Sequence, residues 1–260
     1  MERVAVDIDG HVLTVGLNRA EKRNAVDPLM FGELGQAFAR LEKDPDLRCG
    51  LLYAHGEHFT AGLDLMHWAE PLSKGAFPEM PDDALDPLGL DTANRLTKPL
   101  VMAVQGTCLT IGIELMLAAD IRVAAKNTRF GQIEIKRGLY PVGGATLRLF
   151  QEFGWGNAMR YLLTADEFGA AEAYRLGLVQ EMVEPGQQFE RALEIAQRVA
   201  ARAPLGVYAT LASARLAREQ GMEAATARLL PDLMRIMPSE DLQEGLNAFL
   251  ERREARFSGR

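Results

Sequence analysis

The 260-residue sequence contains only two cysteines, Cys49 and Cys108, and both lie in apolar surroundings. Two such cysteines are typical of reduced core residues, because small secreted proteins need a larger framework of disulfides. The chain begins MERVAVDIDG, which lacks the basic start and the apolar core of a secretory signal. We therefore expect a cytoplasmic protein.

Long uncharged hydrophobic runs and runs of basic residues are also missing. The most apolar stretch, residues 108–125, is interrupted by Glu114 and Asp120, so it does not have the composition of a membrane-spanning helix. The net charge is −7, and arginine and lysine are scattered along the chain. Broad binding to nucleic acid or to an anionic membrane needs concentrated positive charge, so we expect neither as a partner.

Several motifs that indicate a particular chemistry are absent. The sequence has no GxSxG elbow of a serine hydrolase, no phosphate loop and no dinucleotide fingerprint. His55 and His58 lie three residues apart, but no third ligand follows at the spacing of a metal site. The sequence therefore gives no indication of a metal or of a redox cofactor.

The chain does have enough apolar residues, 48% of the total, to bury a large core. Residues 3–18 alternate apolar and polar side chains around Asp9-Gly10, which predicts a β-hairpin. Strand patterns and helix patterns then alternate along the chain to about residue 185. This alternation predicts a mixed α/β core over residues 1–187.

The end of the chain has a different pattern. Amphipathic helices follow one another with breaks near Pro204, Gly221 and Pro238, and no strand pattern occurs among them. We expect residues 188–260 to form a separate helical region. Within the core, residues 71–91 are rich in proline, aspartate and glycine, which predicts a long surface loop.

The apolar run at 108–125 contains Glu114, four residues after Thr110, which is placed to cap a helix that begins at Ile111. This helix would be apolar on every side and so would lie inside the protein. Two interpretations of Glu114 remain open: an arginine or backbone donors hold it as a structural group, or it does chemistry. Glu134 supplies a second carboxylate from a separate element, and two carboxylates in one cavity could divide the duties of acid and base.

Two predicted helix starts add backbone donors. The N–H of Leu63 follows Gly62, and the N–H of Ile111 follows Thr110. The first N–H groups of a helix have no partner within it, so two of them that face one cavity would form an oxyanion hole. The alternative is that both are ordinary helix starts whose small residues serve packing.

These segments, in this order, resemble the crotonase superfamily of enoyl-CoA hydratases and isomerases, and the similarity covers nearly the whole chain. The segments that carry it are LNRAEKRNAV (17–26), HFTAGLDL (58–65), KPLVMAVQGTCLTIGIELMLAADIRVAA (98–125), FGQIEIKRGLYPVGGATLRL (130–149) and TADEFGAAEAYRLGLVQEMV (164–183). The resemblance implies an α/β fold, a crotonase-like spiral of repeated ββα units with a C-terminal helical trimerisation region. It also implies a homotrimer, or a homohexamer made of two trimers.

The resemblance further implies roles for individual residues. Leu63 and Ile111 correspond to the backbone donors that hold the thioester oxygen, while Glu114 and Glu134 correspond to the two catalytic glutamates of hydratases. An acyl-CoA thioester is then the substrate, with coenzyme A as part of it and no separate cofactor. The residues expected to contact the substrate or its coenzyme A are Lys22, Ala61, Leu63, Asp64, Met66, Trp68 and Val142.

Some of these residues also have simpler interpretations. Lys22 stands between Arg19 and Arg23, and the three cations could bind the phosphates of coenzyme A or could form a solvated turn. Asp64 could stabilise a helix start. Met66 and Trp68 could be core residues, or they could line an apolar channel beside the loop; these two readings of the pattern remain open.

The sequence departs from the family pattern at two places. Thr110-Ile111-Gly112 replaces a run of three glycines, and Val142 replaces a glycine after Pro141. A backbone N–H does not depend on the side chain, so we expect the donor at Ile111 to remain while its branched side chain narrows the acyl pocket. The leading hypothesis is hydration of a 2-enoyl-CoA to a 3-hydroxyacyl-CoA. The alternatives are a double-bond isomerase, a thioester hydrolase and a non-catalytic acyl-CoA-binding protein.

Overall fold

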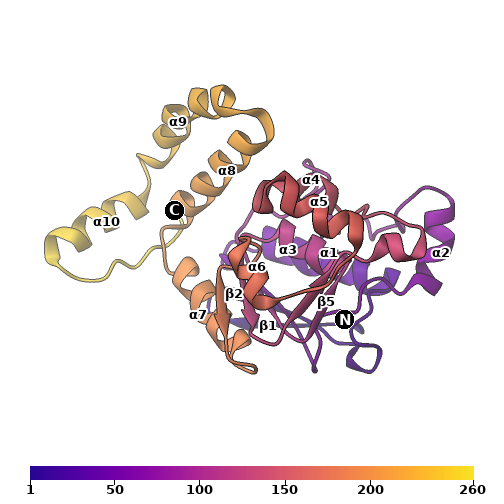
Figure 1. Cartoon of the computed structure of the whole chain (residues 1–260). Helices are drawn as coiled ribbons and strands as arrows, with labels where there is room; N and C mark the ends of the chain where they lie inside the picture. The colour runs from indigo at the N-terminus through magenta and orange to yellow at the C-terminus, as the bar shows by residue number, and fades with distance from the viewer.

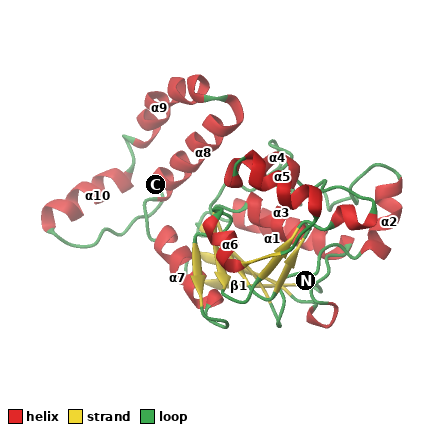
Figure 2. Ribbon diagram, in the orientation of Figure 1, coloured by secondary structure: helices red, strands yellow, loops and turns green.

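The computed structural model describes all 260 residues, which form a large and a small β-sheet, helices around them, and a helical tail (Figures 1 and 2). The strands are β1 (Val4–Asp9), β2 (Val12–Leu17), β3 (Cys49–Ala54), β4 (Leu100–Val104), β5 (Thr107–Leu109), β6 (Ile121–Ala125), β7 (Arg129–Gly131), β8 (Phe168–Gly169) and β9 (Glu181–Val183). The helices are η1 (Ala20–Lys22), α1 (Pro28–Lys43), α2 (Leu65–Ser73), α3 (Ile111–Ala118), η2 (Glu134–Arg137), α4 (Ala145–Phe153), α5 (Trp155–Thr164), α6 (Ala170–Arg175), α7 (Gln188–Ala200), α8 (Pro204–Gln220), α9 (Met222–Ile236) and α10 (Glu240–Glu251), where η marks a 3-10 helix.

The large sheet has the strand order β1-β2-β3-β4-β6-β9. Its first two strands form the predicted antiparallel hairpin, in which Asp9 pairs with Val12, so this prediction is confirmed. Gly10 closes the turn with a φ of +56°, a backbone conformation that costs glycine little. The remaining strands pair in parallel.

Helices cover both faces of the large sheet. Successive strand residues point to opposite faces, so Val12 packs on one side with Ala192 of α7, while Leu13 belongs to the core shared with Leu34 of α1. Both faces are therefore buried, which explains why the parallel strands are continuously apolar. The larger of these two cores also contains α3, and it places the apolar run around Glu114 inside the protein.

The chain repeats a ββα unit. One repeat runs through β4, β5 and α3, and the next runs through β6, β7 and η2. Short β5 pairs in parallel with β7, and on its other side Cys108 forms a parallel bridge with Thr60 of the preceding repeat. The residues that follow these short strands therefore lie at one edge of the small sheet, although they come from three separate segments.

The predicted loop begins slightly later than expected. Residues 71–73 belong to α2, because Leu72 packs against the core and carries the helix past Pro71. From Lys74 to Pro99 the chain then forms neither helix nor named strand, in agreement with the prediction for the rest of this segment.

The last part of the chain is helical, as the sequence predicts, with breaks at the predicted positions. Helix α7 packs against β3, β4 and β6, whereas α8 and α9 pack on each other and extend with α10 away from the sheets (Figure 1). The division of the chain at residue 187 stays a prediction. None of the helices has both the length and the apolar character that a bilayer crossing requires.

Candidate active site

A cavity of about 1160 Å³ opens at the edge of the small sheet where the three repeats meet. Its walls come from α2 and the segment before it, from the first half of α3, and from the segment between Ile133 and the loop before α4. The lining residues are Ala61, Leu63, Leu65, Leu72, Thr110, Ile111, Glu114, Ile133, Glu134, Arg137, Gly138, Leu139, Tyr140 and Val142. All four residues predicted to carry the chemistry thus line one cavity.

The two expected backbone donors belong to neighbouring repeats. Neither the N–H of Leu63 nor that of Ile111 bonds to a carbonyl in the turns and loops. Gly62, with a φ of +106°, and Thr110, with a φ of +50°, turn the chain just before each donor. Free N–H groups beside a cavity can stabilise negative charge on an oxygen atom.

Thr110 occupies the position that precedes α3, but its side chain does not cap the helix. With φ +50° and ψ −113°, its backbone turns the side chain toward Gly62 and away from the first N–H groups of α3. The hydroxyl Oγ1 is buried without a hydrogen-bond partner. The predicted cap is therefore wrong, and the helix start keeps its free donors.

Glu114 is 5% exposed and is held by backbone donors from the next repeat. Its Oε1 accepts hydrogen bonds from the N–H of Gly143 at 2.7 Å and from the N–H of Ala145 at 3.2 Å. Burial raises the pKa of this carboxyl from 4.5 to about 7, against the opposing effects of the two N–H donors and of Arg148. Backbone donors thus hold Glu114, as the structural interpretation expects, while its carboxyl also lines the cavity, as a chemical role requires.

Gly143 makes this position of Glu114 possible. A Cβ atom on Gly143 would lie 2.3 Å from Oε2 of Glu114, so only glycine leaves room for the carboxylate. Contacts this short displace one of the two groups. Gly143 is therefore needed for the position of Glu114, and the sequence alone does not show this requirement.

Glu134 is the first residue of η2 and is partly buried. Burial raises the pKa of its carboxyl to about 7; its own backbone N–H lowers the pKa, and the charge of Glu114 raises it further. With its amide nitrogen turned toward this carboxylate, the buried Gln132 donates to Oε1 at 2.6 Å and to Oε2 at 3.0 Å. Two carboxyls of similar pKa in one cavity can exchange protons with a bound molecule near neutral pH.

The residues expected to contact the substrate separate into two groups. Ala61, Leu63 and Val142 line the cavity. Met66 lies outside its lining and is 87% exposed, whereas Trp68 is fully buried and donates from Nε1 to the carbonyl of Val26. Trp68 is thus a core residue, because its ring packs edge-on against other aromatic rings.

The charged residues of the expected coenzyme site also separate. Asp64 does not cap α2; it pairs with Arg19 at 2.9 Å and with His67 at 3.0 Å. Arg19 is 6% exposed and also lies 3.4 Å from Asp27, so it is committed to internal ion pairs and cannot reach a phosphate. Lys22 is exposed, as a solvent-facing phosphate contact would require, but it does not line the cavity.

Sequence reasoning missed several residues of the site. Gln132 lies within the FGQIE segment, but its contact with Glu134 depends on the turn into η2. Arg137 and Tyr140 follow Glu134 closely and line the cavity, which no periodic pattern indicates. The apolar pair Leu139-Tyr140, so close after Glu134 in the sequence, is the one signal that could have located this wall.

Comparison with known proteins agrees with this geometry. The sequence model of the family described as Enoyl-CoA hydratase/isomerase matches residues 7–260. The chain is 36% identical to enoyl-CoA hydratase EchA19 of Mycobacterium tuberculosis, over 98% of this chain and 96% of that protein. It is 33% identical to (E)-benzylidenesuccinyl-CoA hydratase of Thauera aromatica, over 98% and 99%. A solved structure of a probable enoyl-CoA hydratase/isomerase from Mycobacterium abscessus is 48% identical, with a TM-score of 0.96 over 100% of this chain and 99% of that one.

The chain therefore belongs to the enoyl-CoA hydratase/isomerase family, and it has the crotonase fold. The expected family and the expected fold class are both confirmed. A second solved structure, enoyl-CoA hydratase from Mycobacterium tuberculosis, has a TM-score of 0.89 at 33% identity and covers 100% of both chains.

Proposed function

We propose that this protein is an enoyl-CoA hydratase, which adds water to a 2-enoyl-CoA and forms a 3-hydroxyacyl-CoA. The observation that carries the proposal is that two proton-exchanging carboxyls and two backbone N–H donors line one cavity. Glu114 and Glu134 are carboxyls with pKa values raised to about 7, and Leu63 and Ile111 have free N–H groups. Hydration needs both, because a carboxylate must take a proton from water while the N–H donors stabilise the charge that develops on the thioester oxygen.

The two N–H groups bind the thioester oxygen. As the oxygen of water bonds to C3, the electron pair of the C2–C3 double bond moves toward the thioester, and negative charge collects on its oxygen. Leu63 and Ile111 donate to that oxygen from fixed backbone positions. Removal of one such donor costs other enzymes about 10²–10³-fold in turnover.

The two carboxyls accept a proton from water and donate a proton to the substrate. Together Glu114 and Glu134 hold the water, and its proton passes to the ionised carboxylate of Glu114, whose Oε1 is already fixed by two N–H donors. Glu134 in its protonated form delivers a proton to C2. Hydroxyl at C3 and hydrogen at C2 then account for one water, and proton exchange between the two carboxyls restores the starting state.

Coenzyme A enters as part of the substrate, and we propose no further cofactor. Lys22 is exposed on η1, and its ammonium group is available for a phosphate of the coenzyme. Arg19 is excluded from this role by its internal ion pairs. Val142 and Ile111 stand in the cavity where the family pattern has glycines, so we assign them to the wall that limits the acyl group.

We also propose that the protein forms a homotrimer or a homohexamer. Helices α9 and α10 expose a series of large apolar side chains that no part of the same chain covers. These side chains are Met222, Leu229, Leu230, Leu233, Met234, Leu246, Phe249 and Leu250. An apolar surface of this extent is typical of an interface between subunits.

Hydration of crotonyl-CoA, with identification of the product, tests the proposal. We expect turnover by the wild type and a loss of about 10²–10⁴-fold in Glu134→Gln, with the affinity for a CoA thioester nearly unchanged. Near-normal hydration by a folded Glu134→Gln variant would refute the assigned role. If Glu114→Gln lost hydration but still isomerised a 3-enoyl-CoA, an isomerase would be the better assignment.

A further inference from the structure

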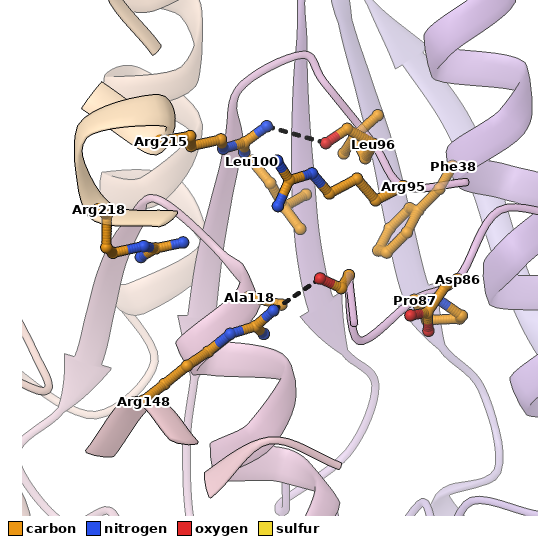
Figure 3. A pocket seen from close by; sticks show the side chains of 11 residues that line it. Phe38, Asp86, Pro87, Arg95, Leu96, Leu100, Ala118, Arg148, Arg215 and Arg218 are labelled. Carbon is orange, nitrogen blue, oxygen red and sulfur yellow. Dashed lines mark hydrogen bonds between the residues drawn. The ribbon is translucent and has the colours of Figure 1, made fainter. Parts of the chain in front are cut away.

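A second cavity shares no lining residue with the candidate active site (Figure 3). It is a hollow of about 420 Å³, partly open to solvent, between α8, α4 and the segment that leads into β4. Its lining residues are Phe38, Asp86, Pro87, Gly89, Arg95, Leu96, Leu100, Ala118, Arg148, Arg215 and Arg218. Because four of these are arginines, we call it the arginine cavity.

The four arginines come from three distant parts of the chain. Arg95 precedes β4, Arg148 belongs to α4, and Arg215 and Arg218 lie one helical turn apart on α8. Figure 3 shows their guanidinium groups approaching the cavity from different sides. The side chains of Arg95 and Arg215 are only 16% and 13% exposed, so these charges are largely withdrawn from solvent.

Two of the arginines have carboxylate partners. Arg95 forms a two-pronged pair with Glu219, and Arg215 reaches Asp120 at 3.2 Å. Both carboxylates are therefore already committed. The only acidic residue in the lining, Asp86, accepts backbone N–H groups at both of its oxygens, and it forms no ion pair.

The other two arginines lack a carboxylate. Arg148 donates to the carbonyl oxygens of Leu88 and Gly89, both at 2.7 Å, and these acceptors carry no net charge. Arg218 is exposed to solvent and forms no hydrogen bond or ion pair within the chain. Burial lowers the pKa of Arg148, and the charges of Arg218 and Arg95 lower it further, against the opposing charges of Asp86 and Glu219.

These guanidinium groups cannot relieve their repulsion by losing protons, because arginine stays charged in proteins. Apolar walls from Phe38, Leu96 and Leu100 keep the surroundings poorly solvating. A planar guanidinium matches the oxygens of a carboxylate or a phosphate, and the partly buried charge of Arg148 is stabilised when such a partner arrives.

We propose that the arginine cavity binds one small oxyanion from solution, with the chemistry of a carboxylate or a phosphate, between Arg148 and Arg218. Since Arg218 belongs to α8 and Arg148 to α4, the anion connects helix α8 of the C-terminal region to the core of the same chain. The site is distinct from the proposed catalytic site, and the proposal does not depend on the proposed function.

Thermal unfolding of the full-length protein in increasing sodium phosphate, with ionic strength held constant by sodium chloride, provides the test. A ligand that binds only the folded protein raises Tm in a saturable way. At a phosphate concentration 100 times the Kd we expect a rise of about 5 °C. Acetate at the same ionic strength should also raise Tm.

Two variants at one position make the test specific. Arg218→Ala removes a side chain that has no partner within the protein, so the fold should persist while the response to phosphate is lost. Arg218→Glu places a carboxylate in the cavity, and it should raise Tm without phosphate and abolish the response to phosphate. Arg202→Ala, at an exposed arginine that does not line the cavity, should respond like the wild type.

Three outcomes would overturn the proposal. In the first, phosphate raises the wild-type Tm no more than chloride does. In the second, Arg218→Ala keeps the full phosphate response, which would place the bound anion elsewhere, for example at a coenzyme phosphate site. In the third, Arg218→Ala changes the oligomeric state in size-exclusion chromatography while phosphate has no effect, which would assign the cavity to a carboxylate side chain of a second copy.

Discussion

Replacement of Glu114 by glutamine separates the chemical role of this residue from its structural role through the dependence of stability on pH. Burial raises the pKa of the carboxyl from 4.5 to about 7, with the Ala145 and Gly143 N–H groups and Arg148 opposing it. Because the folded-state pKa lies above the unfolded value, the stability contributed by the protonated carboxyl is fully present below pH 4.5 and is lost as the pH rises through about 7. One pH unit corresponds to about 1.4 kcal/mol, so the whole loss amounts to about 3 kcal/mol.

Glutamine is uncharged at every pH, and its amide oxygen can still accept the N–H groups of Gly143 and Ala145. The variant should therefore keep the fold and escape the loss of stability. Urea unfolding at pH 5 and pH 8 measures this. Relative to the wild type, we expect Glu114→Gln to gain about 2.5 kcal/mol between the two pH values, because a small part of the loss precedes pH 5. Loss of the Glu114 charge also removes one cause of the raised pKa of Glu134, which acts in the same direction.

Hydration of crotonyl-CoA is measured on the same samples, and we expect turnover to fall by about 10²–10⁴-fold. Glu190→Gln, at an exposed position on α7, serves as the control and should change neither the turnover nor the pH dependence of stability. An equal stability difference at pH 5 and pH 8 would refute the reasoning that Glu114 is a desolvated carboxyl. A stability gain at pH 8 with normal turnover would refute its catalytic role alone.

Three further substitutions test separate parts of the site. Gly143→Ala places a Cβ 2.3 Å from Oε2 of Glu114, so we expect kcat to fall about 10²-fold; Gly156→Ala adds its methyl to open space and should keep the wild-type kcat, and equal values for the two would contradict the assignment. Lys22→Ala should raise KM for a CoA thioester at low salt with kcat little changed, and a KM that stays the same at low salt would exclude a phosphate contact. Ile111→Gly should retain activity and shift preference toward bulkier acyl groups in assays with short, branched and aromatic enoyl-CoA substrates, and an unchanged preference would exclude Ile111 as the selective residue.

The sequence by itself determined those features that depend on neighbouring residues. Asp9-Gly10 specified the hairpin, because the left-handed turn favours glycine at that point. The all-apolar pattern after Thr110 specified a buried helix, and it thereby specified that the Glu114 carboxyl would be desolvated. The order of the motifs was sufficient to predict the family and its fold.

Only the tertiary structure decided the partners of the charged and polar side chains. Glu114 receives its two N–H donors from residues 29 and 31 positions away, because α3 and the loop before α4 belong to successive repeats. In the same way, Arg19 pairs with Asp64, 45 positions along the chain, and so does not join the expected cationic group. Trp68 is buried in the core, where it donates to the carbonyl of Val26, and so does not line the expected substrate site. Local patterns report which face of an element is apolar, since that depends on spacing over a few residues. The partner of a buried polar group depends on which distant elements pack together, and that choice is made by the fold as a whole.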